Sequence, residues 1–271
     1  MKKLTYFVPV DFSECSYNAL QYATMLARFA EGKVVLCHVI NLEEITDSEN
    51  PVVVSWGVDR LERKAKAKMK SLREIIALDD VPVEDIIVMG NPGLELMKQI
   101  EKSVPAVVVI GRNSEKKPGK HSMVTYITRR TNIPVLVVPG SHHPQVPNNA
   151  LLATDAGPDK LYGYAQLYEI LQKTSQQLSV VSIKNRLSPQ DADTRQWIET
   201  LHKSYGITAC ILEDQQQNCR GVAQLIQANK VDLLCTVKKR NGLLGWIFGT
   251  GQKEVFAEDV PVPMLVLNDI G

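Results

Sequence analysis

The sequence predicts an α/β protein made of two copies of one domain, each an open, parallel, five-stranded sheet flanked by helices. Each half opens with an apolar run that ends in an aspartate, which is Asp11 in LTYFVPVD and Asp155 in ALLATD. Each half also closes on an apolar strand pattern after a proline, IPVLVVPG at 133–140 and VPMLVLND at 262–269. Self-similarity at so long a period indicates a duplicated domain, and strand patterns that alternate with helical patterns indicate a parallel sheet.

The strands expected in the first half are nearly continuous apolar runs, which is typical of strands covered on both faces. Those runs are Leu4–Val10, Val34–Ile40, Val83–Met89, Pro105–Ile110 and Ile133–Val138.

Helical patterns separate these strands. Ser13 stands where a helix N-cap belongs, and apolar residues then recur at helical spacing until Gly32. Residues 41–55 are expected to form a loop, and Val58–Leu78 a long surface helix rich in lysine and arginine. The turn at 90–93 opens a further helix, Leu94–Lys102, and the last helix of this half starts at Ser122 and ends near residue 130.

The second half repeats this order after a polar linker. We predict domains at 1–140 and 149–271, with 141–148 between them, and the second copy is the more divergent. Its predicted strands are 149–154, 178–184, 207–213, 231–236 and 262–267, with helices near 158–174, 191–204, 218–229 and 247–258.

Composition favours a cytoplasmic protein. Of 271 residues, 44% are hydrophobic and 23% charged, and the net charge of +1 gives no general attraction for nucleic acid or an anionic membrane. No apolar run reaches the ~18 residues of a membrane helix, and the N-terminal pattern is that of a first strand, not a signal peptide. The five cysteines match no metal-binding pattern and are expected to be reduced, so we predict no metal site.

Ligands of such sheets bind outside the carboxyl ends of the strands. This rule places Asp11, Val39, Gly111 and Ser122 on one rim of the first half. Three of these residues also have a purely structural explanation. Asp11 can cap the first helix, Gly111 can form a tight turn, and Ser122 can be a plain N-cap.

The chain resembles the universal stress protein family. In the first half the resemblance rests on VPVDFSECSYNAL, GNPGLELMKQI, PAVVVIGRNS and NIPVLVVP, and in the second on LLATDAGP, VDLLCTV and VPVPMLVL, in the family's order. It implies a tandem protein of two Rossmann-like domains with strand order 3-2-1-4-5. It also implies that the two domains pair through Ile133–Val138 and Val262–Leu267, and it leaves room for a further homodimer.

The resemblance further implies an adenine nucleotide, ATP or AMP, with Mg²⁺ accompanying it. In the first half, Asp11, the backbone at Val39 and a loop with Gly111, Ser114 and Ser122 would hold the nucleotide. Asp155, Gly249 and Thr250 stand at the corresponding places of the second half.

Both loops depart from the family's Gly-x-x-Gly-x9-Gly-Ser/Thr pattern. In the first half Ser114 replaces the second glycine and His121 precedes Ser122; in the second half Val237 and Arg240 replace the first two glycines. A side chain at a position that needs positive φ costs on the order of 1 kcal/mol. Neither loop is therefore expected to hold a triphosphate in the family's usual way.

The sequence leaves more than one function open. One is a stress-response regulator that binds a nucleotide in at least one half. Another is a tandem protein that binds no nucleotide and acts through protein partners or another small ligand. A nucleotide hydrolase is less favoured, because no His-carboxylate pair or metal cluster is fixed by spacing, and no catalytic residue is predicted.

Overall fold

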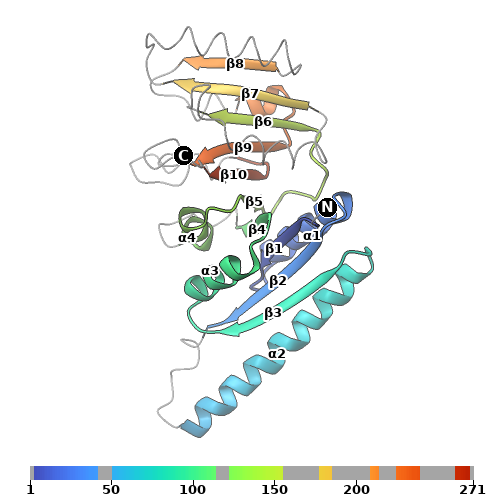
Figure 1. Cartoon of the computed structure of the whole chain (residues 1–271), viewed down its shortest axis with the longest axis vertical. Coiled ribbons are helices and arrows are strands. Elements are labelled where there is room, and N and C mark those ends of the chain that lie inside the picture. Colours follow the sequence, from blue (N-terminus) through green and yellow to red (C-terminus); the bar gives the residue numbers. More distant parts are fainter. Residues whose placement is uncertain are drawn as a thin grey trace. The chain divides into compact units, whose positions relative to one another are not determined.

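The computed structural model describes residues 3–41, 51–113, 122–154, 177–184, 208–213, 224–238 and 260–268. The chain divides into two compact units, with the boundary between Pro144 and Gln145. Figure 1 shows the course of the chain, and each unit is described by itself below.

The first unit is built on a parallel sheet of five strands. The strands are β1 (Thr5–Pro9), β2 (Lys33–Ile40), β3 (Val83–Met89), β4 (Val107–Arg112) and β5 (Val135–Pro139). Their order across the sheet is β3-β2-β1-β4-β5, and each neighbouring pair runs parallel. This confirms the order 3-2-1-4-5 that the family resemblance implied.

Four helices connect these strands: α1 (Glu14–Phe29), α2 (Pro51–Ala77), α3 (Pro92–Ser103) and α4 (Met123–Arg130). Right-handed crossovers in this strand order put α1 and α2 on one face of the sheet and α3 and α4 on the other. Consistent with this, α1 packs on β1 and β4, α2 packs on β3 and β2, and α3 contacts α4. In Figure 1, α2 runs alongside β3.

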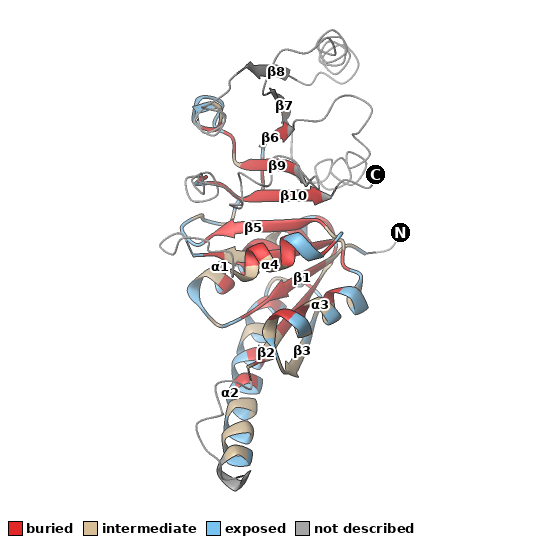
Figure 2. Ribbon diagram, turned by 90° about the vertical axis from the view of Figure 1, so that its left-hand side faces the viewer, coloured by how far each residue is buried: buried red, intermediate tan, exposed pale blue. Residues whose placement is uncertain are grey.

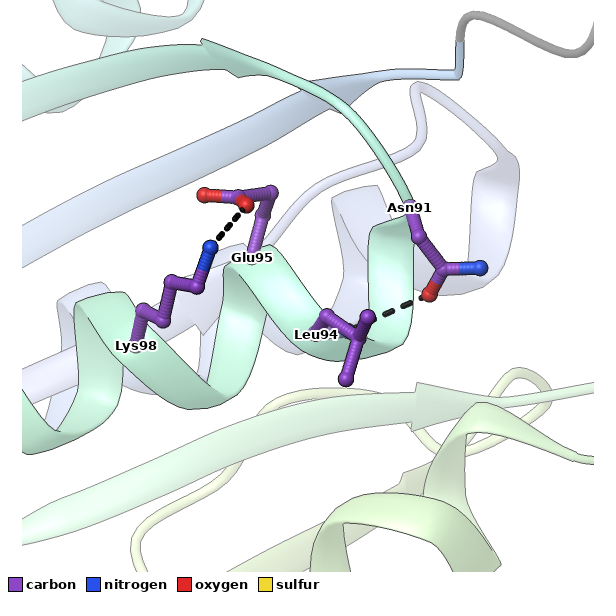
Figure 3. A network of polar contacts seen from close by, with 4 residues as sticks. All are labelled: Asn91, Leu94, Glu95 and Lys98. Carbon is purple, nitrogen blue, oxygen red and sulfur yellow. Dashed lines mark hydrogen bonds and ion pairs between the residues drawn. The ribbon is translucent and has the colours of Figure 1, made fainter.

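Side chains cap the helices as local sequence predicts. The Ser13 hydroxyl oxygen accepts a hydrogen bond from the Ser16 N–H (3.2 Å), and Ser122 does the same for Thr125 (3.2 Å). At the start of α3, Asn91 Oδ1 accepts from the Leu94 N–H (3.2 Å), as Figure 3 shows. Both predicted serine caps are therefore confirmed, and each satisfies a backbone donor that the helix leaves open.

Several element boundaries differ from the prediction. Helix α2 begins at Pro51, inside the segment expected to be a loop. Proline is compatible with the first position of a helix, because the backbone N–H that it lacks would have no acceptor within the helix there. Helix α3 likewise starts at Pro92 and takes in Gly93, which were assigned to a turn. Strand β4 continues through Gly111 to Arg112, so Gly111 does not end the strand.

Gly32 does not end α1 in the expected way. The helix finishes at Phe29, and Glu31, not the glycine, takes the left-handed conformation (φ 51°). A Cβ on Gly32 would stand 2.6 Å from the Leu4 carbonyl oxygen. The glycine is needed there because β1 passes so close to it.

The core of the first unit lies between its central strands and the helices that cover them. Figure 2 shows the strands β1 and β5 buried along their length. Tyr6, Phe7 and Leu36 on the strands, with Leu20 and Tyr22 on α1, are each at most 2% exposed. Burial also raises the pKa of the Tyr6 hydroxyl to about 12.

The second unit has the same strand order. Its strands are β6 (Asn149–Thr154), β7 (Gln177–Lys184), β8 (Thr208–Glu213), β9 (Leu233–Lys238) and β10 (Met264–Asn268). They run parallel in the order β8-β7-β6-β9-β10, and residues 224–228 are helical. The helices predicted near 158–174, 191–204 and 247–258 lie outside the described residues.

Asp232 joins the starts of two strands in this unit. Its carboxylate accepts hydrogen bonds from the backbone N–H groups of Asn148 (3.0 Å) and Asn149 (2.9 Å), just where β6 begins. In return, the Asp232 N–H donates to the Asn149 carbonyl oxygen (3.0 Å). This exchange fixes β6 against β9 at their amino ends.

A search of the described residues finds no helix with the length and apolarity to cross a membrane. The same part of the chain holds no group of three or more His, Cys, Asp or Glu side chains placed to bind a metal ion. Cys15, Cys37 and Cys235 form no disulfide among the described residues. Burial, with a smaller contribution from Glu95, raises the pKa of the Cys37 thiol to about 12.

Candidate functional site

A cavity of about 440 Å³ opens at the carboxyl ends of β1, β2 and β4 in the first unit. Its wall includes Asp11, Val39 and Gly111, three of the residues that the sequence placed on this rim. Residues of α2, α3 and α4 complete the wall, including Ala65, Leu96 and Met123. The volume falls within the roughly 300–1,000 Å³ typical of small-molecule sites.

The chain turns sharply where β1 ends, and this turn positions Asp11. The Val10 N–H still donates to the Cys37 carbonyl oxygen (2.8 Å), but Phe12 then takes a left-handed conformation (φ 64°). For a residue with a Cβ this conformation costs on the order of 1 kcal/mol. Neighbouring side chains hold Phe12 in place. Its ring centroid lies 4.3 Å from that of His38, and the Lys68 ammonium lies 4.7 Å from it.

One oxygen of the Asp11 carboxylate accepts two hydrogen bonds just before α1 begins. Oδ1 accepts hydrogen bonds from the Ser13 N–H (2.9 Å) and the Ser13 hydroxyl (2.5 Å). Burial acts to raise the pKa of Asp11, but the hydrogen bonds, those from Ser13 foremost, outweigh it and leave the pKa below its ordinary value. Asp11 is therefore a carboxylate at neutral pH that both supports the helix start and lines the cavity.

Strand β2 extends past the end of β1, and this exposes an edge of backbone. Strand β1 ends at Pro9, opposite Cys37, and the Cys37 carbonyl points toward β1, where it accepts from Val10. The Ile40 carbonyl points the other way and accepts from the Gly90 N–H beyond β3 (3.1 Å). Because backbone groups alternate along a strand, the N–H and C=O of Val39 point to the β1 side, where β1 has already turned away.

His38 closes the same corner of the cavity. Its Nδ1 lies 2.8 Å from the Val10 carbonyl oxygen, and since a carbonyl can only accept, Nδ1 carries the hydrogen. The Val10 carbonyl thus holds the imidazole, which lines the cavity beside Val39.

Gly111 is required by packing against α1. A Cβ on Gly111 would stand 2.2 Å from the Cys15 carbonyl oxygen and 3.0 Å from the Ser16 nitrogen. Only glycine allows the first turn of α1 to approach β4 so closely. Gly111 keeps an extended strand conformation there and pairs with Val138 of β5.

Among the described residues, Ser122 is the predicted site residue that does not line the cavity. Ser122 caps α4 and donates its hydroxyl hydrogen to Thr125 Oγ1 (2.8 Å), while the adjacent Met123 lines the cavity in its place. Four predicted site residues lie outside the described residues, namely Ser114, Asp155, Gly249 and Thr250.

Sequence reasoning missed the contribution of α2. Leu61, Lys64, Ala65 and Lys68 line the cavity, and they recur at helical spacing on one face of that helix. That spacing was the available signal, but a lysine-rich helix face is normally solvated, so nothing local pointed to a cavity. Phe12 was missed as well, because its role depends on a left-handed backbone that local sequence does not predict for phenylalanine.

The model of the universal stress protein family matches residues 6–139. The chain is 30% identical to universal stress protein MJ0577 of Methanocaldococcus jannaschii over 156 residues, which are 51% of this chain and 94% of that protein.

Two solved structures are similar over nearly the whole chain. A universal stress protein from Archaeoglobus fulgidus matches with a TM-score of 0.76 and 17% identity, over 98% of both chains. A functionally unknown protein from Pseudomonas aeruginosa PAO1 matches with a TM-score of 0.65 and 14% identity, over 98% of this chain and 93% of that one. At these identities the likeness is one of fold, whereas the family model and the archaeal sequence relative establish descent. The chain belongs to the universal stress protein family.

Proposed function

We propose that the first unit binds an adenine nucleotide, AMP or ATP, and that the protein serves as a cytoplasmic stress-response regulator through this binding. The observation that carries the proposal is that Asp11 and the backbone edge of Val39 line one cavity. A carboxylate accepts hydrogen bonds from hydroxyl or amino groups, and a backbone N–H and C=O together match the donor–acceptor edge of adenine. The apolar neighbours Leu61, Ala65 and Leu96 provide surface for a base.

In this proposal, the phosphates extend from the cavity toward the end of β4. Gly111, Ser114 and Ser122 are the residues that the family resemblance assigns to that end, with Mg²⁺ accompanying a triphosphate. Ser122 supports this role only through the open N-terminus of α4, because its hydroxyl is already engaged with Thr125.

The proposal extends to the second unit as a second domain of the same family. Its strand order repeats that of the first unit, and the family resemblance in its sequence favours domains at 1–140 and 149–271 with a linker at 141–148. Asp155, Gly249 and Thr250 are the residues with which it would bind a nucleotide of its own.

A second function is favoured by one observation, the contact between Gly111 and the backbone of Cys15. That contact explains why position 111 requires glycine, and the explanation involves no bound phosphate. Together with Ser114 in place of a glycine, it supports a protein that binds no nucleotide and acts through protein partners or another small ligand.

Protein purified without added nucleotide distinguishes these functions. After denaturation, mass spectrometry of the supernatant should detect AMP or ATP, and millimolar ATP should raise the melting temperature of wild type. ADP that accumulates over time would instead indicate hydrolysis. The absence of both a released nucleotide and a thermal shift would favour the second function.

A matched pair of variants assigns any shift to the proposed cavity. Asp11→Ala should abolish it, because the carboxylate acceptor is lost. Asp59→Ala removes an exposed carboxylate from α2 that is not among the residues lining the cavity, and it should leave the shift intact. If ATP raises the melting temperature of Asp11→Ala as much as that of wild type, the nucleotide binds elsewhere.

A further inference from the structure

Two lysines of α2 line the cavity. Lys64 and Lys68 both line it and are four residues apart, so they lie one above the other on one helix face. Both residues are exposed. The Lys68 ammonium lies over the Phe12 ring, 4.7 Å from the ring centroid. The cation–π contact directs Lys68 toward the turn that carries Asp11.

Among the described residues, some lysines of α2 are in ion pairs with glutamates of the same helix, and others are not. Lys66 forms an ion pair with Glu62, and Lys70 lies 3.9 Å from Glu74. Within the described part of the chain, neither Lys64 nor Lys68 is in an ion pair. The helix therefore pairs its lysines away from the cavity and leaves those at the cavity available.

The cavity wall carries an excess of positive charge. Among its described lining residues, Asp11 is the only carboxylate, and it faces two lysine ammonium groups. One Asp11 oxygen already accepts two hydrogen bonds from Ser13, which disperse its charge. An anionic group entering beside α2 would thus meet two cations that no ion pair of the described residues neutralises.

We propose that Lys64 and Lys68 form an anion subsite that binds a phosphate group of the ligand, so that the site selects phosphorylated nucleosides over uncharged ones. This inference rests on the proposed function. It also accounts for the loss of glycines from the loop after β4, where Ser114 stands at a glycine position. Charge supplied by α2 replaces part of the backbone amide contacts that such glycines permit.

The test compares adenosine and AMP binding by calorimetry. Wild type should bind AMP on the order of tenfold more tightly than adenosine, because the lysine–phosphate contacts add an attraction that the uncharged nucleoside lacks. In the double variant Lys64→Gln/Lys68→Gln this advantage should vanish, so that AMP and adenosine bind with about equal affinity. Adenosine binding that remains measurable shows that the variant's cavity is folded.

The matched control is Lys66→Gln/Lys70→Gln, which removes the same charge from the same helix at positions that do not line the cavity. It should keep the preference for AMP. If the cavity double variant keeps that preference too, the inference is wrong, and the proposed nucleotide site stands with its phosphate elsewhere. If wild type binds neither adenosine nor AMP, both the inference and the proposed function are wrong.

Discussion

The backbone of Cys15 lies so close to Gly111 that a Cβ on the glycine would stand 2.2 Å from the Cys15 carbonyl oxygen. This contact seats the first turn of α1 on β4 and brings the Asp11 turn to the cavity. Gly111 is thus a packing residue of the site, whatever ligand the site holds.

Gly111→Ala should destabilise the first unit. The new Cβ meets backbone, which cannot move without displacing α1, and overpacking of this kind costs about 1–3 kcal/mol. Urea denaturation measures the loss. Gly140→Ala is the control, because its Cβ would meet mainly the Cys15 Sγ (2.8 Å), a side-chain atom that can rotate away. Equal stability of Gly111→Ala and wild type would contradict the packing role.

Asp11 should make stability depend on acid pH. Its pKa in the folded state lies below the ordinary value, so its carboxylate stabilises the fold above the unfolded-state pKa of about 3.9, and this contribution is lost as the pH falls through the folded pKa. The free energy of unfolding, measured from pH 7 down to pH 2, should fall more steeply for wild type than for Asp11→Asn. Parallel curves would show that the Ser13 hydrogen bonds do not favour the ionised form.

Ser122 offers a way to separate capping from phosphate binding. Ser122→Ala should lower the free energy of unfolding by about 1 kcal/mol, because the Thr125 N–H loses its acceptor. Ser122→Asp should retain stability, since aspartate is also a good N-cap, but its charge should weaken ATP binding. Denaturation and ATP titration of the two variants measure both effects. Unchanged ATP affinity in Ser122→Asp would place the phosphates away from α4.

Much of this fold could be predicted because it is encoded locally. The caps at Ser13 and Ser122 depend on residues within one helical turn, and the strands follow from apolar runs. The start of α2 at Pro51 was missed, since the acidic and Pro/Ser-marked segment at 41–55 has the composition of a loop.

The site was predicted only in part, for a different reason. Asp11, Val39 and Gly111 follow from the rule that parallel strands present their carboxyl ends at one edge. The need for glycine at 111 depends on Cys15, and the cavity wall includes Lys64 and Lys68 of a distant helix. Such contacts arise from packing between elements far apart in sequence, which no local pattern specifies.

We propose that the two units pair through Ile133–Val138 and Val262–Leu267. An unpaired edge strand leaves about half of its backbone N–H groups in water, whereas a paired strand protects all of them. Hydrogen exchange of the whole chain should therefore be slow at every amide of β5 and β10. Rapid exchange at alternate amides of both strands would mean that each remains an edge.

The central claim is that an adenine nucleotide binds between Asp11 and the Val39 backbone. Titration of the isotope-labelled protein with AMP, followed by amide NMR, tests it most directly. We expect the largest saturable shifts at the Val39 amide and in the Asp11–Ser13 turn, and their loss in Asp11→Ala. Chemical-shift changes confined to other residues, with the Val39 amide and this turn unchanged, would contradict the claim. The absence of any saturable change at millimolar AMP would contradict it as well.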